Sequence, residues 1–205
     1  KCRRRSGSRF QSFVLFLLTE LWYDSYMRKR TAGGDGRDMR IGTRRLIIAD
    51  LTPDMWEDVY RNSRDGDMRR FVPDEMLETP DEAREAVQFL MGRYGSAEGP
   101  FVHPILLKTG GNIGYVQLVK IPEGWEIGYH VAERHAGNGY ATEAVRAFLP
   151  AIASEKGLTE VFGICLAENA ASARVLEKCG FEKVFQGMGT YQGAEREIVR
   201  YIWRA

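Results

Sequence analysis

A glycine-rich turn between a strand-like run and a helix-like run constrains the fold of this chain more than any other feature. Residues 125–132 suit a strand, residues 139–156 suit a long helix, and the turn between them runs from Arg134 to Gly139 as RHAGNG. The first N–H groups of a helix have no partner within it, and the helix dipole favours an anion beside them. Gly137 and Gly139 allow a close backbone approach, and Arg134 adds a cation. The segment therefore predicts an anion-binding helix start.

Periodic hydrophobic patterns continue from Thr43 onward and predict a mixed α/β (α+β) domain. The Thr-Pro-Asp sequences at Thr52 and Thr79 are typical of helix starts, because Thr caps a helix and Pro fits its first turn. The Thr-Gly-Gly-Asn sequence at 109–112 predicts a hairpin. We expect strands at 45–49, 100–108, 113–121, 125–132, 161–166, 181–186 and 197–203, and helices at 52–62, 79–91, 139–156 and 170–179.

The N-terminal segment differs in charge from the rest of the chain. Residues 1–45 contain 12 Lys/Arg and 4 Asp/Glu, whereas the other 160 residues contain 17 and 24, so a basic leader precedes an acidic body. The apolar residues 13–18 are too few for a bilayer span or a complete signal peptide. An interfacial amphipathic helix, a docking helix and a non-native extension all remain open. Residues 28–42 predict a flexible linker, so we expect a leader at 1–42 and one domain at 43–205.

Composition argues against several other classes of protein. Three scattered cysteines and three histidines predict neither a disulfide framework nor a metal site, and they fit a reducing, cytoplasmic setting. Cys165 and Cys179 suit small buried positions. The acidic body has no basic-aromatic pattern, which argues against nucleic-acid binding. No segment is long enough for stable membrane insertion.

Three motifs in order resemble those of the GCN5-related N-acetyltransferases (GNAT). The turn fits the acetyl-CoA signature R/Q-x-x-G-x-G/A, and its extension Gly-Tyr-Ala-Thr-Glu-Ala is similar to that of the RimJ/RimL subgroup of ribosomal-protein N-terminal acetyltransferases. Residues 43–48 resemble the opening strand of that subgroup, and residues 169–181 resemble its N-x-x-S…GF segment. The resemblance covers 43–203. It implies a twisted, mostly antiparallel sheet of about seven strands, flanked by about four helices and splayed between strands four and five.

The resemblance also implies a co-substrate and its contacts. Acetyl-CoA would place its pantetheine arm in the gap between the fourth and fifth strands, and an amine would attack the thioester directly, without an acyl-enzyme. Main-chain groups would contact the arm and thioester, the turn would hold the pyrophosphate, and an asparagine would lie beside the pantetheine. By position, the main-chain contacts to the arm and thioester fall to Tyr129, Val131 and Ala132. The pyrophosphate falls to Gly137, Asn138 and Gly139 with Arg134, and the place beside the pantetheine falls to Asn169.

Direct attack requires a neutral amine, and a free alkylammonium has a pKa near 10, so a positioned base is needed. Glu126 matches the strand-four glutamate that serves as base in several enzymes of this fold. Strand alternation places Glu126, Gly128 and His130 on one face, with Ile127 and Tyr129 on the other. His130 is therefore a second candidate for the base, or else a structural histidine. Glu126 has an alternative role as well, in orienting the substrate or binding a neighbouring cation.

The leaving thiolate needs a proton or a hydrogen bond. Many family members use a tyrosine at the position of Leu176, so the chain departs from the family there, and the RimL-like pattern suggests Ser172 instead. The alternative for Ser172 is a helix-capping serine.

We therefore expect an N-acetyltransferase, monomeric or homodimeric, that acts on a primary amine of a small molecule or a protein N-terminus. A non-catalytic acyl-CoA sensor or interaction module is the alternative. Residues 71–75, the first two helices and the loop 187–193 are expected to shape the acceptor pocket.

Overall fold

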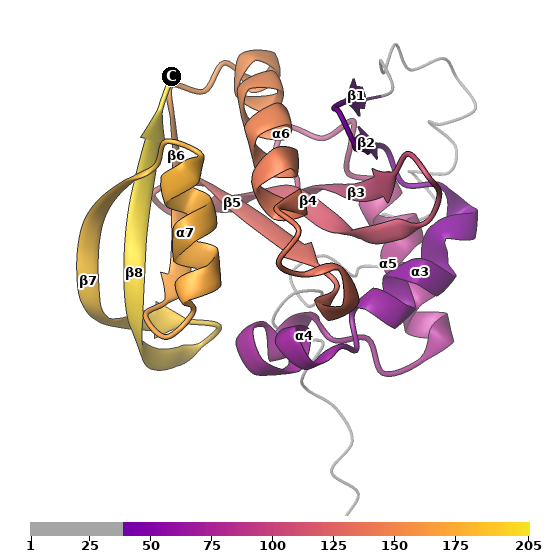
Figure 1. The fold of residues 1–205 in the computed structure, drawn as a ribbon, viewed down its shortest axis with the longest axis horizontal. Coiled ribbons are helices and arrows are strands. Elements are labelled where there is room, and N and C mark those ends of the chain that lie inside the picture. The colour runs from indigo at the N-terminus through magenta and orange to yellow at the C-terminus, as the bar shows by residue number, and fades with distance from the viewer. Residues whose placement is uncertain (1–38) are drawn as a thin grey trace, which may run out of the picture.

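In the computed structural model, which describes residues 39–205, one mixed sheet of eight strands organises the chain (Figure 1). The spatial order is β1-β2-β3-β4-β5-β6-β8-β7, and only β5 and β6 are parallel neighbours. The predicted mixed, mostly antiparallel sheet is confirmed. The interpretations of residues 1–38 lie outside the described part of the chain. The strands are β1 (Arg40–Gly42), β2 (Leu46–Ala49), β3 (Phe101–Leu107), β4 (Asn112–Ile121), β5 (Gly124–Val131), β6 (Glu160–Leu166), β7 (Glu182–Tyr191) and β8 (Ala194–Arg204).

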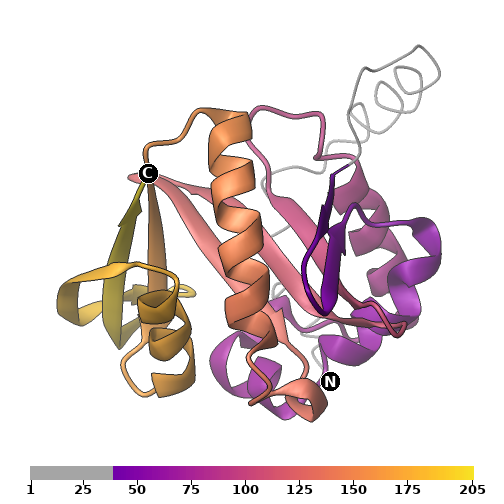
Figure 2. The ribbon, with the colours of Figure 1, turned by 45° about the horizontal axis from the view of Figure 1, so that its top comes forward.

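Strands β5 and β6 separate soon after they meet. Their ladder contains a single residue pair, Glu126 with Phe162, whereas β4 and β5 pair over eight positions and β6 and β8 over seven. Figure 2 shows β5 and β6 together near the C-terminus and diverging from there. β5 and β6 are the strands expected at 125–132 and 161–166, so the predicted splay is confirmed, and it opens a gap in the middle of the sheet.

Helices cover both faces of this sheet (Figure 2). α6 lies across β2, β4 and β5, and α7 lies on β6 and β7, whereas α3 packs against β4 and α5. α6 starts after Gly139 and ends at Gly157, both left-handed, as the sequence predicts. The helices are α3 (Trp56–Asn62), α4 (Gly66–Phe71), α5 (Pro80–Met91), α6 (Tyr140–Lys156) and α7 (Ala170–Lys178), with short 3-10 turns η1 (Pro53–Met55), η2 (Pro73–Glu75) and η3 (Glu133–His135).

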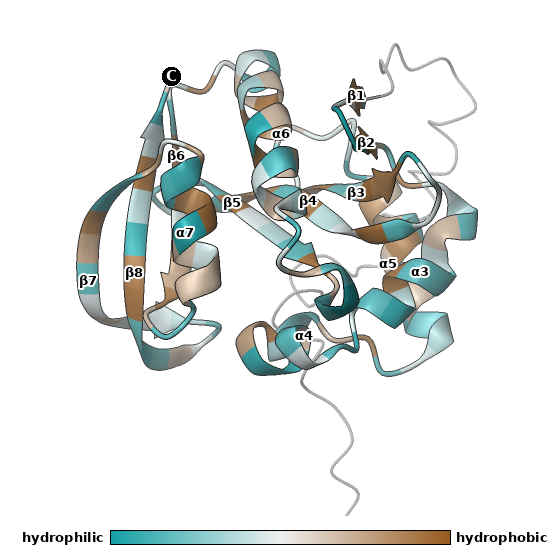
Figure 3. Cartoon of the chain, in the orientation of Figure 1, coloured by the Kyte–Doolittle hydropathy of each residue, from teal (hydrophilic) through white to brown (hydrophobic). Residues whose placement is uncertain are grey.

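The core lies mainly between the sheet and α6. Val116 and Leu118 of β4 and Ile127 of β5 are buried together with Phe148 and Ile152 of α6. Alternation along these strands sends the intervening residues to the opposite face, where α3, α4 and η2 lie. Figure 3 shows apolar and polar stretches along β7 and β8, without a strict alternation. The two faces of β5 therefore carry different chemistry, and the gap beside β5 connects them.

Several local features differ from what the sequence predicts. β1 lies in the expected linker, because residues 40–42 add a strand to the edge of β2. α4 was not predicted; it is a short helix that Asp65 caps by accepting from the Met68 N–H. Thr79 caps α5 as predicted, but the Thr52 side chain makes no capping hydrogen bond, and a 3-10 turn comes before α3.

The expected loop 187–193 is mostly strand. β7 and β8 form a long hairpin that turns at Gln192–Gly193, both with positive φ. Gly187 and Gly189 lower the intrinsic strand propensity of β7, but pairing along β8 overrides it. A side chain at Gly189 would lie 2.7 Å from Ile198 Cδ1, so this glycine lets Ile198 pack against the strand. The β3–β4 hairpin, in contrast, turns at the predicted glycines, where the Gly110 N–H donates to Leu107 O.

Candidate active site

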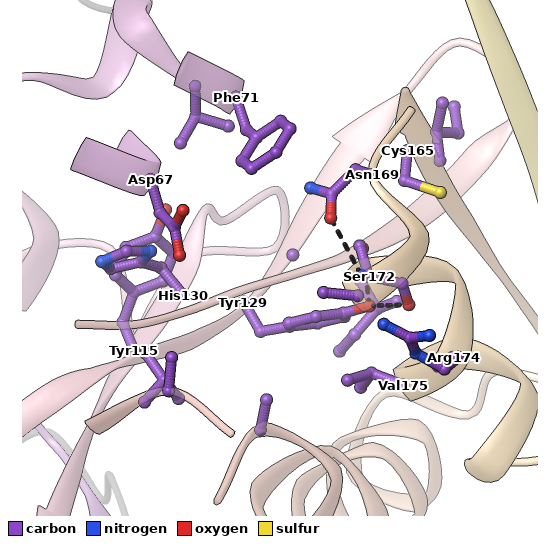
Figure 4. A pocket seen from close by; sticks show the side chains of 18 of the residues that line it. Asp67, Phe71, Tyr115, Tyr129, His130, Cys165, Asn169, Ser172, Arg174 and Val175 are labelled. Carbon is purple, nitrogen blue, oxygen red and sulfur yellow. Dashed lines mark hydrogen bonds between the residues drawn. The ribbon is translucent and has the colours of Figure 1, made fainter. Parts of the chain in front are cut away.

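A cavity of about 820 Å³ occupies the gap between β5 and β6 and reaches both faces of the sheet. One end is lined by the start of α6 and by α7, and the other by α4, η2 and the tip of the β7–β8 hairpin. Figure 4 shows Tyr129 extending toward Ser172 on α7, while Asp67, Phe71, Tyr115 and His130 lie on the opposite side. We call the end lined by α6 and α7 the donor end, and the end lined by α4, η2 and the β7–β8 hairpin the acceptor end.

The start of α6 at the donor end is an open anion site. Gly137 and Gly139 both have a φ of 76°, and a side chain added at Gly137 would meet nothing within 4 Å. No side chain caps the helix, so its first N–H groups are free to bind a ligand. Gly137, Gly139 and the first three residues of the helix all line the cavity. The geometry fits the diphosphate of a nucleotide-like ligand such as acetyl-CoA.

The side chains of two residues expected to bind the phosphates, Arg134 and Asn138, make hydrogen bonds within the protein in this structure. Arg134 points to α3, where its Nη2 donates to Asn62 Oδ1 at 2.8 Å. Asn138 Nδ2 donates to the carbonyl oxygens of His135 and Ala136, both at 3.1 Å. Neither Arg134 nor Asn138 lines the cavity. In this structure their side chains shape the turn from behind, and the backbone of the turn faces the cavity.

Arg45 is a residue of this region that the sequence did not single out by role. Its guanidinium bonds Glu143 of α6 at 2.6 Å and the carbonyl of Asn138 at 2.9 Å, and it stacks on the Tyr140 ring. Glu143 also accepts from Thr43 Oγ1 at 2.6 Å. The motif at 43–48 therefore contacts the motif at Gly139–Ala144, although the two are about 100 residues apart in the sequence. These contacts hold the start of α6 in place.

The backbone of β5 offers unpaired groups to the gap. The Ala132 N–H donates to Ile113 O, so the hydrogen-bonded positions opposite β4 fall on the even-numbered residues of β5. The main-chain groups of Tyr129 and Val131 therefore point away from β4 and toward the gap, as the proposed pantetheine contacts require. Those of Ala132 do not, because its N–H is bonded to Ile113 and its carbonyl accepts from the His135 N–H.

Glu126 lies where the two strands part, and its side chain lines the cavity. Burial raises its pKa from 4.5 to about 7, and the nearby carboxyl of Glu75 adds to the rise. Arg200 and a hydrogen bond from the Ile164 backbone oppose it, but they do not outweigh burial. A carboxyl with such a pKa accepts a proton near neutral pH more readily than an ordinary glutamate.

His130 shares the face of Glu126 but is held by another element. Its Nε2 lies 3.1 Å from Asp65 Oδ2, and the side chain is 8% exposed. Burial acts to raise the pKa of Asp65, but hydrogen bonds from His130 and from the backbone of Met68 and Glu133 outweigh it and lower the value to about 2. This ionised partner ties His130 to the cap of α4, which supports the structural role over that of a base.

Ser172 and Asn169 meet Tyr129 at the donor end. Asn169, and not Ser172, caps α7, since its Oδ1 accepts from the Ser172 N–H at 3.0 Å. The Ser172 hydroxyl is therefore not used by the helix cap, and its Oγ is hydrogen-bonded to Tyr129 Oη at 2.9 Å. Tyr129 Oη also donates to the Ser172 carbonyl at 2.9 Å. Both hydroxyls line the cavity, as does Asn169.

Packing explains why a leucine stands at position 176, where many members of the family that the sequence resembles have a tyrosine. Leu176 is 1% exposed, and its methyl groups fill the space over Gly163 of β6. Neither cysteine supplies a thiolate nucleophile at neutral pH, because burial raises the pKa of Cys165 and of Cys179 to about 11. Both of these cysteines are free; Cys165 is buried as the sequence predicts, but Cys179 is only partly buried.

The sequence did not single out a second carboxyl at the acceptor end. Glu75 accepts a short hydrogen bond from Tyr115 Oη, and Gln117 Nε2 donates to it at 3.5 Å. Phe71, Val72 and Glu75 line the cavity, as expected for residues 71–75, whereas no residue of the first two expected helices, 52–62 and 79–91, lines it. Burial raises the pKa of Glu75, against the two hydrogen bonds that lower it.

A sheet that is splayed over a cavity, an uncapped glycine-rich helix start and a buried carboxyl in the gap define an enzyme that transfers acyl groups from coenzyme A. The sequence profile of the acetyltransferase (GNAT) domain matches residues 45–182. The chain belongs to this family, and in general terms it is an acetyl-CoA-dependent N-acetyltransferase.

Similar proteins agree with this assignment. YnaD of Bacillus subtilis (strain 168), an uncharacterized N-acetyltransferase, is 28% identical over 148 residues, which cover 71% of this chain and 84% of YnaD. A GNAT-family acetyltransferase from Bacillus anthracis is 25% identical, with a TM-score of 0.70 over 81% of this chain and 98% of that one. The RimL ribosomal L7/L12 acetyltransferase in complex with coenzyme A has a TM-score of 0.71 over 81% and 98% of the chains. At 15% identity, it shows the shared fold alone.

Two further observations concern the described residues only. Between residues 39 and 205, no helix is long and apolar enough to cross a membrane. In the same part of the chain, no group of three or more His, Cys, Asp or Glu side chains lies together as metal ligands would.

Proposed function

We propose that the protein transfers acetyl directly from acetyl-CoA to a primary amine, with Glu126 as the general base. The observation that carries the proposal is a buried carboxyl with a pKa of about 7 that faces the cavity at the point where β5 and β6 part. A base of this kind is needed because the acceptor enters as an ammonium ion. The same position argues against a sensor without turnover, which has no need of a proton acceptor there.

The donor would be held mainly by backbone groups. The N–H groups at the start of α6, with Gly137 and Gly139, would bind the pyrophosphate. The unpaired main-chain groups of Tyr129 and Val131 would bond the pantetheine arm, as an added strand would. The Asn169 amide would lie beside the arm at the start of α7. The thioester would then lie in the part of the cavity lined by Glu126 and Ser172.

Two protons leave the amine during the transfer. The first passes from the ammonium to Glu126, and the freed nitrogen lone pair then forms the C–N bond to the thioester carbon. When the C–S bond breaks, its electron pair stays on sulfur. The Ser172 hydroxyl donates to this sulfur, and the second nitrogen proton replaces the one that Ser172 gives up. Tyr129, whose Oη lies 2.9 Å from Ser172 Oγ, positions that hydroxyl.

The experiment is a thiol-release assay with the full chain, acetyl-CoA and a panel of amines. The panel includes peptides with ribosomal-protein N-termini, which test the RimJ/RimL-like assignment, together with aminoglycosides, polyamines and amino acid amides. We expect release that depends on at least one amine and that falls when Glu126 is replaced by Gln. Coenzyme A binding without transfer to any amine would favour the sensor instead, and a lack of coenzyme A binding would contradict the donor site.

A further inference from the structure

The acceptor end of the cavity holds a second carboxyl, Glu75, which the proposed transfer mechanism does not use. Each of its oxygens already has one donor from β4: Tyr115 Oη bonds Oε2, and Gln117 Nε2 lies 3.5 Å from Oε1. An ionised carboxylate has about four acceptor positions, so each oxygen keeps one free. Glu75 lines the cavity together with Tyr115, Gln117 and Glu126. It is thus a fixed acceptor of hydrogen bonds with unused capacity.

The shape of β5 brings this carboxyl close to the base. Gly128 lies directly across from Gln117 in the β4–β5 ladder, two residues from Glu126 on the same face. A side chain at Gly128 would approach Gln117 Nε2 to 2.6 Å, so Gln117 occupies the place that a larger residue would take. The glycine thereby lets Gln117 hold Glu75 over β5. Glu75 and Glu126 line the same cavity, and Glu75 is close enough for its charge to raise the pKa of Glu126, so an ammonium group between them would face both carboxyls.

The charges around this space select against a second anion. The acidic residues among the described residues that line the cavity are Asp67, Glu75, Glu126 and Glu168, and the first three come from the acceptor end. Arg70 is the cavity-lining cation nearest to Glu75 in the sequence, and its Nε lies 3.7 Å from a carboxylate oxygen of Glu168. Arg174 and Lys178 belong to α7, and Figure 4 shows Arg174 beside Val175, on the side opposite Asp67 and Tyr115. Arg200 lies near Glu126 and is 3.5 Å from Glu123. Arg70 and Arg200 are therefore each paired with a glutamate, and a carboxylate next to the reacting amine would face Glu75.

We propose that Glu75 binds the ammonium group of the acceptor, and that the acceptor is a primary amine whose neighbouring carbon carries no carboxylate. An amidated amino acid and a peptide N-terminus share this chemistry, and a free amino acid does not. The inference rests on the proposed function in that Glu126 takes the proton from the same ammonium group. Phe71, Val72, Val119 and Tyr191 line the same part of the cavity and suit an uncharged body on the amine.

The test compares three matched pairs of probes, the amides and free acids of alanine, leucine and phenylalanine. Calorimetric titration of the full chain measures binding, and thiol release from acetyl-CoA measures transfer. We expect at least one amide to bind at least tenfold more tightly than its acid, and Glu75→Gln to weaken the binding of that amide at least tenfold. The KM for acetyl-CoA should not change. Asp74→Asn is the matched control, because it removes an exposed charge from the same turn and does not line the cavity.

A second variant guards against a folding defect in Glu75→Gln. Tyr115→Phe keeps the carboxyl but removes the donor that fixes it, so the KM for the amide should rise about three- to tenfold. Equal binding within every pair, or normal amide binding by both variants, would overturn the inference. Transfer without selectivity would overturn it and leave the proposed function standing. Selective binding without transfer to any amine would support the role of Glu75 and contradict the proposed function.

Discussion

Replacement of Glu126 by Gln separates the activity of this carboxyl from its effect on stability. Glutamine has nearly the same shape but accepts no proton. General-base catalysis contributes about 10²–10⁴-fold, so kcat should fall by about 10²-fold or more while the KM for acetyl-CoA stays constant. In the wild type only ionised Glu126 is active, so the rate should rise with pH to a plateau with a midpoint near 7. At pH 6 it should be about a tenth of the plateau, and the variant should lose this inflection.

The stability effect follows from the same pKa. The folded protein holds the proton of Glu126 up to about pH 7, whereas an unfolded chain releases it near 4.5. Between these values the folded state binds more protons, so stability falls as pH rises from 4.5 to 7. The full difference corresponds to roughly 3 kcal/mol. Glu126→Gln should therefore be more stable than the wild type above pH 7, by on the order of 5–10 °C in Tm, and no more stable below pH 4.5.

Thermal melts at pH 4, 6 and 8 together with kcat over the same range measure both effects. Glu160→Gln is the control, because it removes an exposed glutamate at the start of β6. The groups that face Glu126 are Glu75, Glu123, Arg200 and Tyr191. Equal melting temperatures of variant and wild type at pH 8 would refute the desolvation argument. An unchanged kcat at pH 8 would refute the assignment of the base.

Three further predictions follow from single contacts. Ser172→Ala should lower kcat about tenfold without changing the amine KM, and an unchanged kcat would mean that the sulfur needs no donor from this hydroxyl. Gly163→Ala should cost about 1–3 kcal/mol of stability in thermal melts, because its methyl group would lie 2.6 Å from Leu176 Cδ2; an unchanged Tm would show that Leu176 moves aside freely. Arg45→Ala removes the ion pair with Glu143 and should raise the KM for acetyl-CoA several-fold with a normal amine KM, whereas a selective effect on the amine would contradict its role at the start of α6.

Features that depend only on residues adjacent in the sequence were predictable. The left-handed glycines at 137 and 139, the stop of α6 at Gly157 and the β3–β4 turn all need conformations that glycine adopts readily, so composition marks them. Periodicity placed most of the other elements. It failed for α4, which is only six residues long, and for β7, where glycines interrupt the strand pattern.

Contacts between distant segments decided how the site is built. The sequence alone predicted a glycine-rich turn before α6 and placed Glu126 on the strand face of Gly128 and His130, because backbone conformation and alternation are local. Only the tertiary structure shows that Arg134 bonds Asn62, that Arg45 contacts the start of α6 and that Glu75 lies at the acceptor end. Only burial in that structure raises the pKa of Glu126 to about 7. Side-chain partners and desolvation depend on what packs nearby, and a linear sequence does not record that.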